Sequence, residues 1–349
     1  MSSTIHSMPR ADVPVVRAPA APGHLPTLDA LRGIAALSVC WFHFTNAQFS
    51  ENLHYHASGK YGWLGVQTFF VISGFVIPFS LFRARYKVGM FFRFMLKRIA
   101  RLDPPYLASI VFVLSGLWVS SLTPGHAPYR INWLQVFAHL GYINAFTGMA
   151  WLQMSYWSLA IEFQYYLLVG LIFPLLALKG RIVPVLLLGL TALGSLANRS
   201  EAFLPHYLPL FATGFLIFRH LTLAPRWAET LTALFAAFAL TIWADGWPQA
   251  LAGLGTALVI LFLHWDHPVL NFFGNISYSV YLLHVFVGQI VFGLAMHAFA
   301  KMPWLSWCVQ FLAVGLVIAA AYIFFRFVEL PSRKLSSRIT YKSNRAFAR

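Results

Sequence analysis

The chain has 349 residues, of which 59% are hydrophobic and only 10% are charged. Soluble globular domains carry about 25% charged residues, so this composition excludes an ordinary soluble fold. Lys and Arg outnumber Asp and Glu by 25 to 10, which gives a formal net charge of +15. In a membrane protein this excess indicates cytoplasmic loops that face anionic lipid, and no nucleic-acid partner is expected.

The two ends of the chain are predicted to lie outside the membrane. Residues 1–26 are rich in Ala and Pro and contain no apolar stretch like that of a cleavable signal peptide. They predict a disordered cytoplasmic tail. A membrane domain over residues 27–330 and a basic cytoplasmic tail over residues 331–349 complete the expected organisation. Both cysteines, Cys40 and Cys308, lie inside apolar segments, so neither a disulfide framework nor a metal site is expected.

Apolar runs recur along the rest of the chain, and about 20 such residues cross a hydrocarbon core as a helix. They predict an all-α integral membrane protein, a polytopic bundle of about ten transmembrane helices with both termini cytoplasmic. The predicted spans cover residues 33–49, 62–82, 105–122, 157–178, 182–197, 203–218, 228–243, 250–264, 276–298 and 304–327.

The distribution of charge sets the topology. Residues 83–101 contain seven cations and no acid, and the chain after residue 327 is basic too, so both are expected in the cytoplasm. If both termini lie in the cytoplasm, the chain must cross the membrane an even number of times. Residues 131–148 form a further apolar segment that contains Asn132, Gln135, His139 and Asn144. Ten crossings follow if that segment is re-entrant, and the sequence leaves open whether it spans.

Ionisable side chains inside a span are functional candidates, because a charge at the bilayer centre costs at least about 2.5 kcal/mol. His43 lies in the first span, eleven residues after Arg32. Eleven residues make about three helical turns and about 16 Å along the axis, so the two side chains are expected on one face. Glu162 is the one acidic residue well within a predicted span.

Weaker patterns fit both packing and function. Ser277, Tyr281 and His284 share a face at helical spacing, and Ser73 with Gly74 permits a close helix approach. Small and polar residues join membrane helices routinely, so packing is the simpler interpretation of each. The cations of residues 83–101 would suit either a phosphate-rich ligand or anionic lipid headgroups.

Six motifs occur in order along nearly the whole chain after Thr27. They are LDALRGIAALSVCWFHF from Leu28, FFVISGF from Phe69, KRIARLDPPY from Lys97, WSLAIEFQYYL from Trp157, ISYSVYLLH from Ile276 and FVELPSRK from Phe327. Together they resemble the acyltransferase-3 family of bacterial membrane acyltransferases, which includes O-antigen, exopolysaccharide and Nod-factor acetylases. One departure is the run AIEFQ, where Glu162 is the only acid and the family usually has a second acid or a Glu-Gln pair.

The resemblance implies an acyltransferase of the bacterial inner (cytoplasmic) membrane. Such an enzyme transfers an acyl group, usually acetyl, from cytoplasmic acetyl-CoA or another acyl-CoA to a hydroxyl of a cell-surface or exported glycan or glycolipid. The predicted catalytic residues are His43, Glu162 and Arg32. Histidine has the pKa that a general base needs near neutral pH, and Glu162 could orient it or the acceptor. Whether His43 acts as base or as acyl acceptor stays open.

The same resemblance implies a donor site at the cytoplasmic surface. Arg98, Arg101, Lys97 and Arg32 are expected to bind CoA phosphates, because guanidinium groups pair bidentately with phosphate. The secondary candidates are Ser73, Tyr281, His284 and Glu329. Glu329, near Arg326, is expected to fix a helix end by pairing.

Two alternatives remain. A proton-coupled transporter or flippase of a glycan or lipid could use His43 and Glu162 as a proton relay. Within the enzyme class, the donor could carry a succinyl or longer acyl chain. The identity of the acceptor and the existence of a homo-oligomer are left open.

Overall fold

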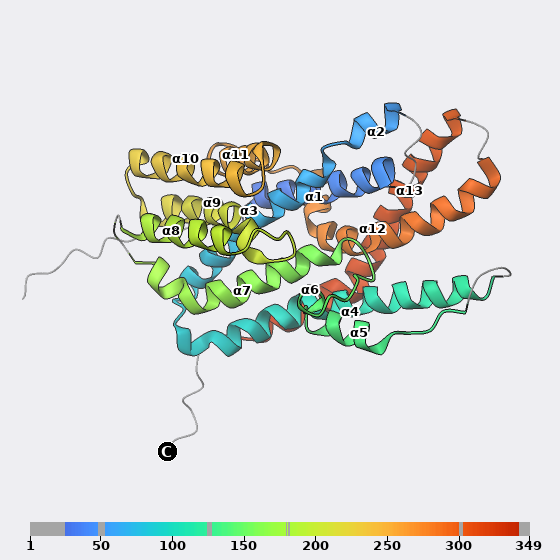
Figure 1. Cartoon of the computed structure of the whole chain (residues 1–349), viewed down its shortest axis with the longest axis horizontal. Coiled ribbons are helices and arrows are strands. Elements are labelled where there is room, and N and C mark those ends of the chain that lie inside the picture. The colour runs from blue at the N-terminus through green and yellow to red at the C-terminus, as the bar shows by residue number, and fades with distance from the viewer. Residues whose placement is uncertain are drawn as a thin grey trace, which may run out of the picture.

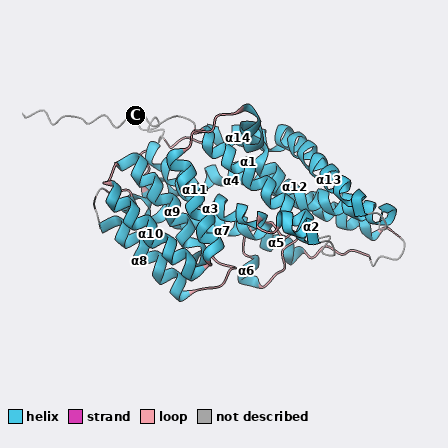
Figure 2. Ribbon diagram, turned by 90° about the horizontal axis from the view of Figure 1, so that it is seen from above, coloured by secondary structure: helices cyan, strands magenta, loops and turns pink. Residues whose placement is uncertain are grey.

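The computed structural model describes residues 25–47, 53–123, 128–178, 180, 182–299 and 303–341. These residues form helices joined by turns and loops, and no β-strand occurs among them (Figure 1; Figure 2). The all-α prediction is confirmed. Most of the predicted tail over residues 1–26, and the end of the one over residues 331–349, lie outside the described residues.

Each predicted span coincides with a helix over most of its described residues. The long helices are α1 (Pro26–Phe42), α3 (Gly65–Arg83), α4 (Phe91–Ser121), α7 (Tyr156–Leu176), α8 (Ile182–Ala197), α9 (Leu204–Leu223), α10 (Trp227–Ala244), α11 (Trp247–Phe262), α12 (Pro268–Phe299) and α13 (Pro303–Phe324). Six helical stretches of the described chain are long and apolar enough to cross a membrane, and α8 and α11 are shorter apolar helices. The number of ten crossings stays a prediction.

The segment that the sequence left open is folded into two short helices, α5 (Trp133–Leu140) and α6 (Asn144–Thr147). With 8 and 4 residues, neither is long enough to span. The polar residues of this segment hold its loops: the backbone N–H of Leu152 donates to His139 Nε2 (3.0 Å), and the Asn144 amide donates to the carbonyl of Ala150 (3.3 Å).

Helix α4 begins fourteen residues before the predicted span, at Phe91, and it includes most of the basic stretch. Its 31 residues correspond to about 46 Å of helix. The loop between α3 and α4 is therefore much shorter than the charge pattern indicated. Arg98 and Arg101 are three residues apart on this helix, so both side chains face the same neighbours.

Glycines allow two helix pairs to touch at the backbone. A Cβ at Gly74 of α3 would clash with the carbonyl oxygen of Phe211 in α9, so the close approach predicted at Ser73 and Gly74 is confirmed. Helices α1 and α12 lie side by side in the same way (Figure 1). A Cβ at Gly33 of α1 would lie 2.8 Å from the Gly274 nitrogen of α12. Small residues at such crossings permit close packing inside a membrane.

Two long helices end in π-helical turns. Helix α1 continues into η1 (His43–Ala47), and α13 continues into η4 (Phe325–Glu329), which leads into α14 (Leu330–Arg338). Single π turns inside helices are frequent at functional sites. Here they carry His43 and Glu329, two of the residues selected from the sequence.

Candidate active site

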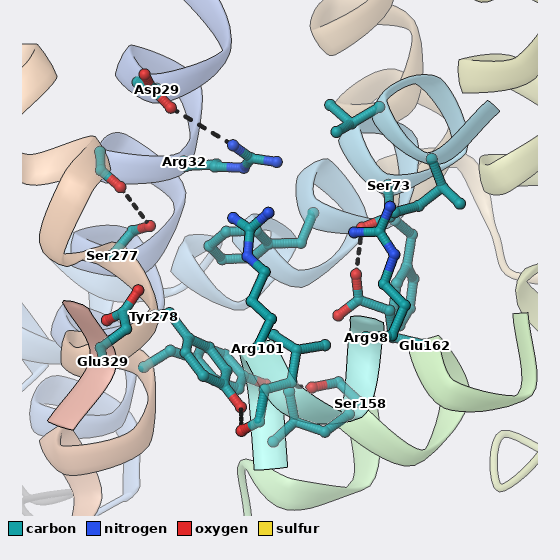
Figure 3. Close-up of a pocket in the computed structure, with 18 of the residues that line it drawn as sticks. Asp29, Arg32, Ser73, Arg98, Arg101, Ser158, Glu162, Ser277, Tyr278 and Glu329 are labelled. Atoms are coloured by element: carbon teal, nitrogen blue, oxygen red, sulfur yellow. Dashed lines mark hydrogen bonds and ion pairs between the residues drawn. The ribbon is translucent and has the colours of Figure 1, made fainter. Parts of the chain in front are cut away.

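A cavity of about 390 Å³ lies between α1, α3, α4, α7, α12 and the η4–α14 segment (Figure 3). Its lining includes Asp29 and Arg32 near the start of α1, and Gly274 and Asn275 in the first half of α12. The polar and charged side chains around it are Asp29, Arg32, Ser73, Arg98, Arg101, Ser158, Glu162, Tyr166, Asn275, Ser277, Tyr278, Tyr281, Glu329 and Arg333.

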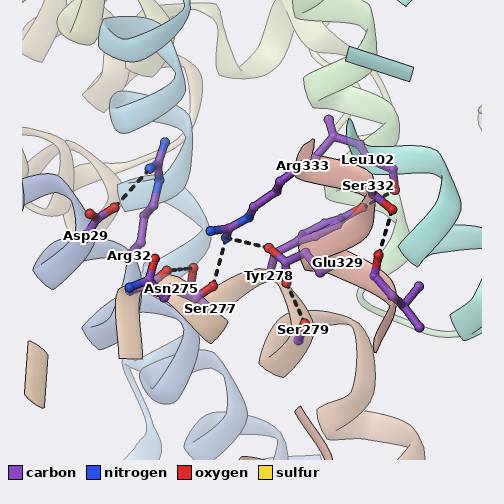
Figure 4. A network of polar contacts seen from close by, with 12 residues as sticks. Asp29, Arg32, Leu102, Asn275, Ser277, Tyr278, Ser279, Glu329, Ser332 and Arg333 are labelled. Atoms are coloured by element: carbon purple, nitrogen blue, oxygen red, sulfur yellow. Dashed lines mark hydrogen bonds and ion pairs between the residues drawn. The ribbon is translucent and has the colours of Figure 1, made fainter. Parts of the chain in front are cut away.

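Each of the three carboxylates in the lining has a partner. Asp29 forms an ion pair with Arg32 (3.4 Å). Glu329, only 2% exposed, pairs with Arg333 and accepts a hydrogen bond from Ser279, both at 2.5 Å (Figure 4). The sequence had suggested Arg326 as its partner. Arg333 takes that place because it lies one helical turn after Glu329.

Glu162 accepts a hydrogen bond from Ser73 Oγ at 2.6 Å (Figure 3). The contact joins α7 to α3 at the close approach beside Gly74. The carboxylate also interacts electrostatically with Arg32 across the cavity. Glu162 therefore belongs to the charged cavity.

The lining of the cavity contains four arginines and three carboxylates. Arg98 donates to Ser80 Oγ (2.9 Å), and its guanidinium lies 5.4 and 5.5 Å from the rings of Phe94 and Tyr166. Within the described chain, the guanidinium group of Arg101 has no hydrogen bond and no ion pair. Its charged neighbours are other guanidinium groups, those of Arg32, Arg98 and Arg333. A cavity in which guanidinium groups outnumber carboxylates is suited to an anionic ligand.

His43 does not line this cavity. Its Nδ1 lies 2.9 Å from the carbonyl oxygen of Val39 and 3.2 Å from Nε2 of His284, and the two imidazole rings are 5.0 Å apart. Glu162 is not among its hydrogen-bond partners. Arg32 and His43 thus belong to two neighbouring places, a charged cavity and a histidine pair.

Tyr281 connects these two places. It lines the cavity, and its ring lies 5.8 Å from the ring of His284. Its hydroxyl is 2.5 Å from that of Ser158 and donates to the carbonyl of Ser155 (3.0 Å). The face of α12 that the sequence identified at Ser277, Tyr281 and His284 therefore runs from the cavity to the histidine pair.

Lys97 is directed away from the cavity. Its Nζ donates to the carbonyl of Ile339 (3.1 Å) and lies 5.6 Å from the ring of Tyr341. The sequence grouped Lys97 with Arg98 and Arg101, and its spacing of four residues from Arg101 would permit a shared face. Its ammonium group bonds the C-terminal segment instead. Lys97 holds the C-terminal segment against α4.

Several lining residues were missed at the level of sequence. Arg333 was assigned to the basic tail, although it stands inside the FVELPSRK motif, four residues after Glu329. Ser158 and Tyr166 flank Glu162 at helical spacing in the WSLAIEFQYYL motif, which was the available signal. Among the described residues there is no group of three or more His, Cys, Asp or Glu side chains that could hold a metal ion.

Comparison with protein families matches residues 25–326 to the acyltransferase-3 family, described as an acyltransferase domain. The O-acetyltransferase OatA of Staphylococcus aureus (strain NCTC 8325 / PS 47) is 33% identical over 166 residues, which are 44% of this chain and 26% of that protein. YrhL of Bacillus subtilis (strain 168), named as a peptidoglycan O-acetyltransferase, is 35% identical over 42% of this chain and 23% of its own length.

A more extended match is SACOL0978 of Staphylococcus aureus (strain COL), named as an O-acetyltransferase. It is 26% identical over 89% of this chain and 58% of its own length. The chain thus spans less than two thirds of each of these relatives. No solved structure matches.

Proposed function

The chain belongs to the acyltransferase-3 family, and from this premise we propose that it is a multi-pass membrane O-acetyltransferase. It transfers acetyl from acetyl-CoA to a hydroxyl of a cell-surface or exported glycan or glycolipid. The bacterial inner membrane is the proposed location, with the donor bound from the cytoplasm.

The charged cavity is the observation that carries the proposal. Arg101 lacks an acidic partner in the described chain, and it stands among three other arginines. Arg101 is half-buried, and withdrawing a charged group from water is costly unless an anion compensates it. The phosphate groups of acyl-CoA supply that charge, and guanidinium groups bind them bidentately. A glycan or lipid flippase has no comparable reason to bind acyl-CoA.

His43 is proposed as the general base. Its side chain is half-buried, next to the end of α12's polar face. Nε2 takes the proton of the acceptor hydroxyl while that oxygen forms a bond to the acetyl carbonyl carbon. The carbon–sulfur bond then breaks, and the same proton passes to the departing CoA thiolate. This step yields an acetyl ester and free CoA, and base catalysis of this kind contributes about 10²- to 10⁴-fold.

The bound donor has to extend from the charged cavity to the histidine pair. Arg32 and His43 are about 16 Å apart along α1, so the flexible arm of acyl-CoA extends from the arginines, past Tyr281, toward the histidine pair. Arg32 is assigned to the donor phosphates. Glu162 is assigned to the cavity, where it orients Ser73 and balances Arg32.

Membrane vesicles of the native strain provide the test, because they carry the natural acceptor along with the enzyme. The gene is deleted from the native strain. The deletion strain is then complemented with a gene for the wild-type protein, the His43→Ala variant or the control variant His220→Met. Vesicles receive [¹⁴C]acetyl-CoA, and base-labile label in the glycan and glycolipid fractions is measured. We expect transfer with wild type, a loss of about 100-fold or more with His43→Ala, and full activity with the control, since His220 bonds Thr230 away from the cavity.

Two outcomes would contradict the proposal. Equal label with and without the gene would exclude the acetyl transfer itself. Wild-type activity in a folded His43→Ala protein would exclude His43 as the base. Label that appears only with succinyl-CoA or a longer acyl-CoA would change the donor but keep the reaction class.

A further inference from the structure

Helices α1 and α12 place two histidines in register. The helices touch at Gly33 and Gly274, where a Cβ has no room. His43 follows Gly33 by ten residues, and His284 follows Gly274 by ten residues. Both helices therefore advance about 15 Å from the glycine contact to the histidine contact. The glycine crossing thus sets the register that brings the rings together.

The surroundings of His284 determine where its proton lies. Its Nδ1 is 3.1 Å from the carbonyl oxygen of Val280 and 2.8 Å from that of Tyr281. Both partners can only accept, so Nδ1 must carry the hydrogen. The neutral ring then presents the lone pair of Nε2 to His43. The side chain is fully buried, at 0% exposure, so it has no solvent to compete for that lone pair.

The proton of His43 follows from the same reasoning. Its Nδ1 is near the Val39 carbonyl oxygen, at 2.9 Å, and near Nε2 of His284, at 3.2 Å. Both are acceptors, so Nδ1 of His43 carries the hydrogen and its neutral ring keeps the lone pair on Nε2. That nitrogen is the one left to receive a proton from an alcohol.

We propose that His284 is a positioning residue: it accepts from Nδ1–H of His43 and so keeps Nε2 of His43 free to act as the base. The proposal rests on the function proposed above. In hydrolases with a Ser-His-Asp triad a carboxylate fixes the histidine in this way. Here a neutral imidazole does so, which avoids a further charge at a buried position. With His284 in this role, Glu162 is not needed to orient His43 and can interact with Ser73 and Arg32 in the charged cavity.

The test compares two substitutions at one position in the same vesicle assay. Met at residue 284 fills space but accepts no comparable hydrogen bond, whereas the carboxamide oxygen of Gln can accept from Nδ1–H of His43. We expect His284→Met to lower kcat by about 10- to 100-fold with KM for acetyl-CoA within about twofold of wild type. His284→Gln should recover most of the lost kcat.

The outcomes separate this inference from the proposed function. If wild type transfers acetyl and His43→Ala does not, but His284→Met has wild-type kcat, the inference is wrong and the function stands. Equal losses in folded Met and Gln variants would also overturn it. Failure of wild type to transfer acetyl would overturn the function itself.

A second measurement does not depend on how variants at residue 284 fold. Purified wild type and His43→Ala are labelled with ¹⁵N-histidine, and the signals missing from the variant belong to His43. Their nitrogen shifts report which ring nitrogen holds the proton at a pH where the ring is neutral. We expect a protonated Nδ1 and a bare Nε2. A proton on Nε2 would refute the assignment.

Discussion

Four guanidinium groups and three carboxylates line the charged cavity, and their pairing is uneven. Asp29 and Glu329 each hold an arginine, and Glu162 is bonded to Ser73. Arg101 is left beside like charges. Since like charges repel more strongly where water is scarce, an anionic ligand relieves this arrangement more than it would at a surface.

Replacing Arg101 should therefore weaken donor binding. Loss of one charge-assisted hydrogen bond costs about 1.5–3 kcal/mol, which is about 10- to 100-fold in KM for acetyl-CoA. Arg101→Leu is compared with Lys97→Leu, because Lys97 lies on the same helix but contacts the C-terminal segment. Steady-state kinetics in vesicles measure both. Unchanged KM in Arg101→Leu, or an equal rise in Lys97→Leu, would argue against a donor site at Arg101.

The sequence predicted which residues belong to the candidate site, but it did not predict which side chains they contact. The sequence identified Arg32, Arg98 and Arg101 as cations near one end of the bundle, and all three line one cavity. It could not separate Lys97 from Arg98, because that requires the rotation of α4 about its axis. It also could not show that His43 meets His284, since helices α1 and α12 are more than 200 residues apart and their contact depends on register.

At the scale of helices, the glycine crossings determine where these side chains meet. Gly74 and Gly214 join α3 to α9, and Gly33 and Gly274 join α1 to α12. The predicted spans coincided with helices because apolar length is a strong signal. Their ends were less predictable: α4 extends back to Phe91 and so includes Arg93, Lys97, Arg98 and Arg101, which hydropathy alone does not register as part of a helix.

A methyl group at Gly74 should destabilise the bundle. Gly74→Ala places a Cβ against the backbone of Phe211, where no side chain can move aside. Overpacking of this kind costs about 1–3 kcal/mol. Gly255→Ala is the matched control, since nothing lies within 4 Å of its added Cβ. Thermal unfolding in detergent should show a lower Tm for Gly74→Ala and a Tm at or above wild type for the control. Equal Tm values would contradict the tight crossing.

For the whole molecule, the positive-inside rule and the fold agree on which parts lie at one end. Ser336 Oγ donates to the carbonyl of Lys97, and Arg93 donates to that of Tyr341, so the C-terminal segment lies on the first half of α4. The loop between α3 and α4 leads directly into this half of α4, so it lies at the same end of the molecule as the C-terminal segment. The loop before α4 and the C-terminal segment must therefore lie on the same side of the membrane.

Cysteine labelling tests that topology directly. In a chain whose Cys40 and Cys308 are replaced by Ala, a single Lys87→Cys lies in the loop before α4, and a single Glu201→Cys lies between α8 and α9; both positions are exposed. With both termini cytoplasmic, a membrane-impermeant maleimide should label Glu201→Cys in cells with a permeabilised outer membrane. Lys87→Cys should react only after lysis, because in this topology its loop faces the cytoplasm, the proposed source of acyl-CoA. The reverse pattern would place the arginine cavity on the outer side, where that donor is absent, and would exclude the proposed direction of transfer.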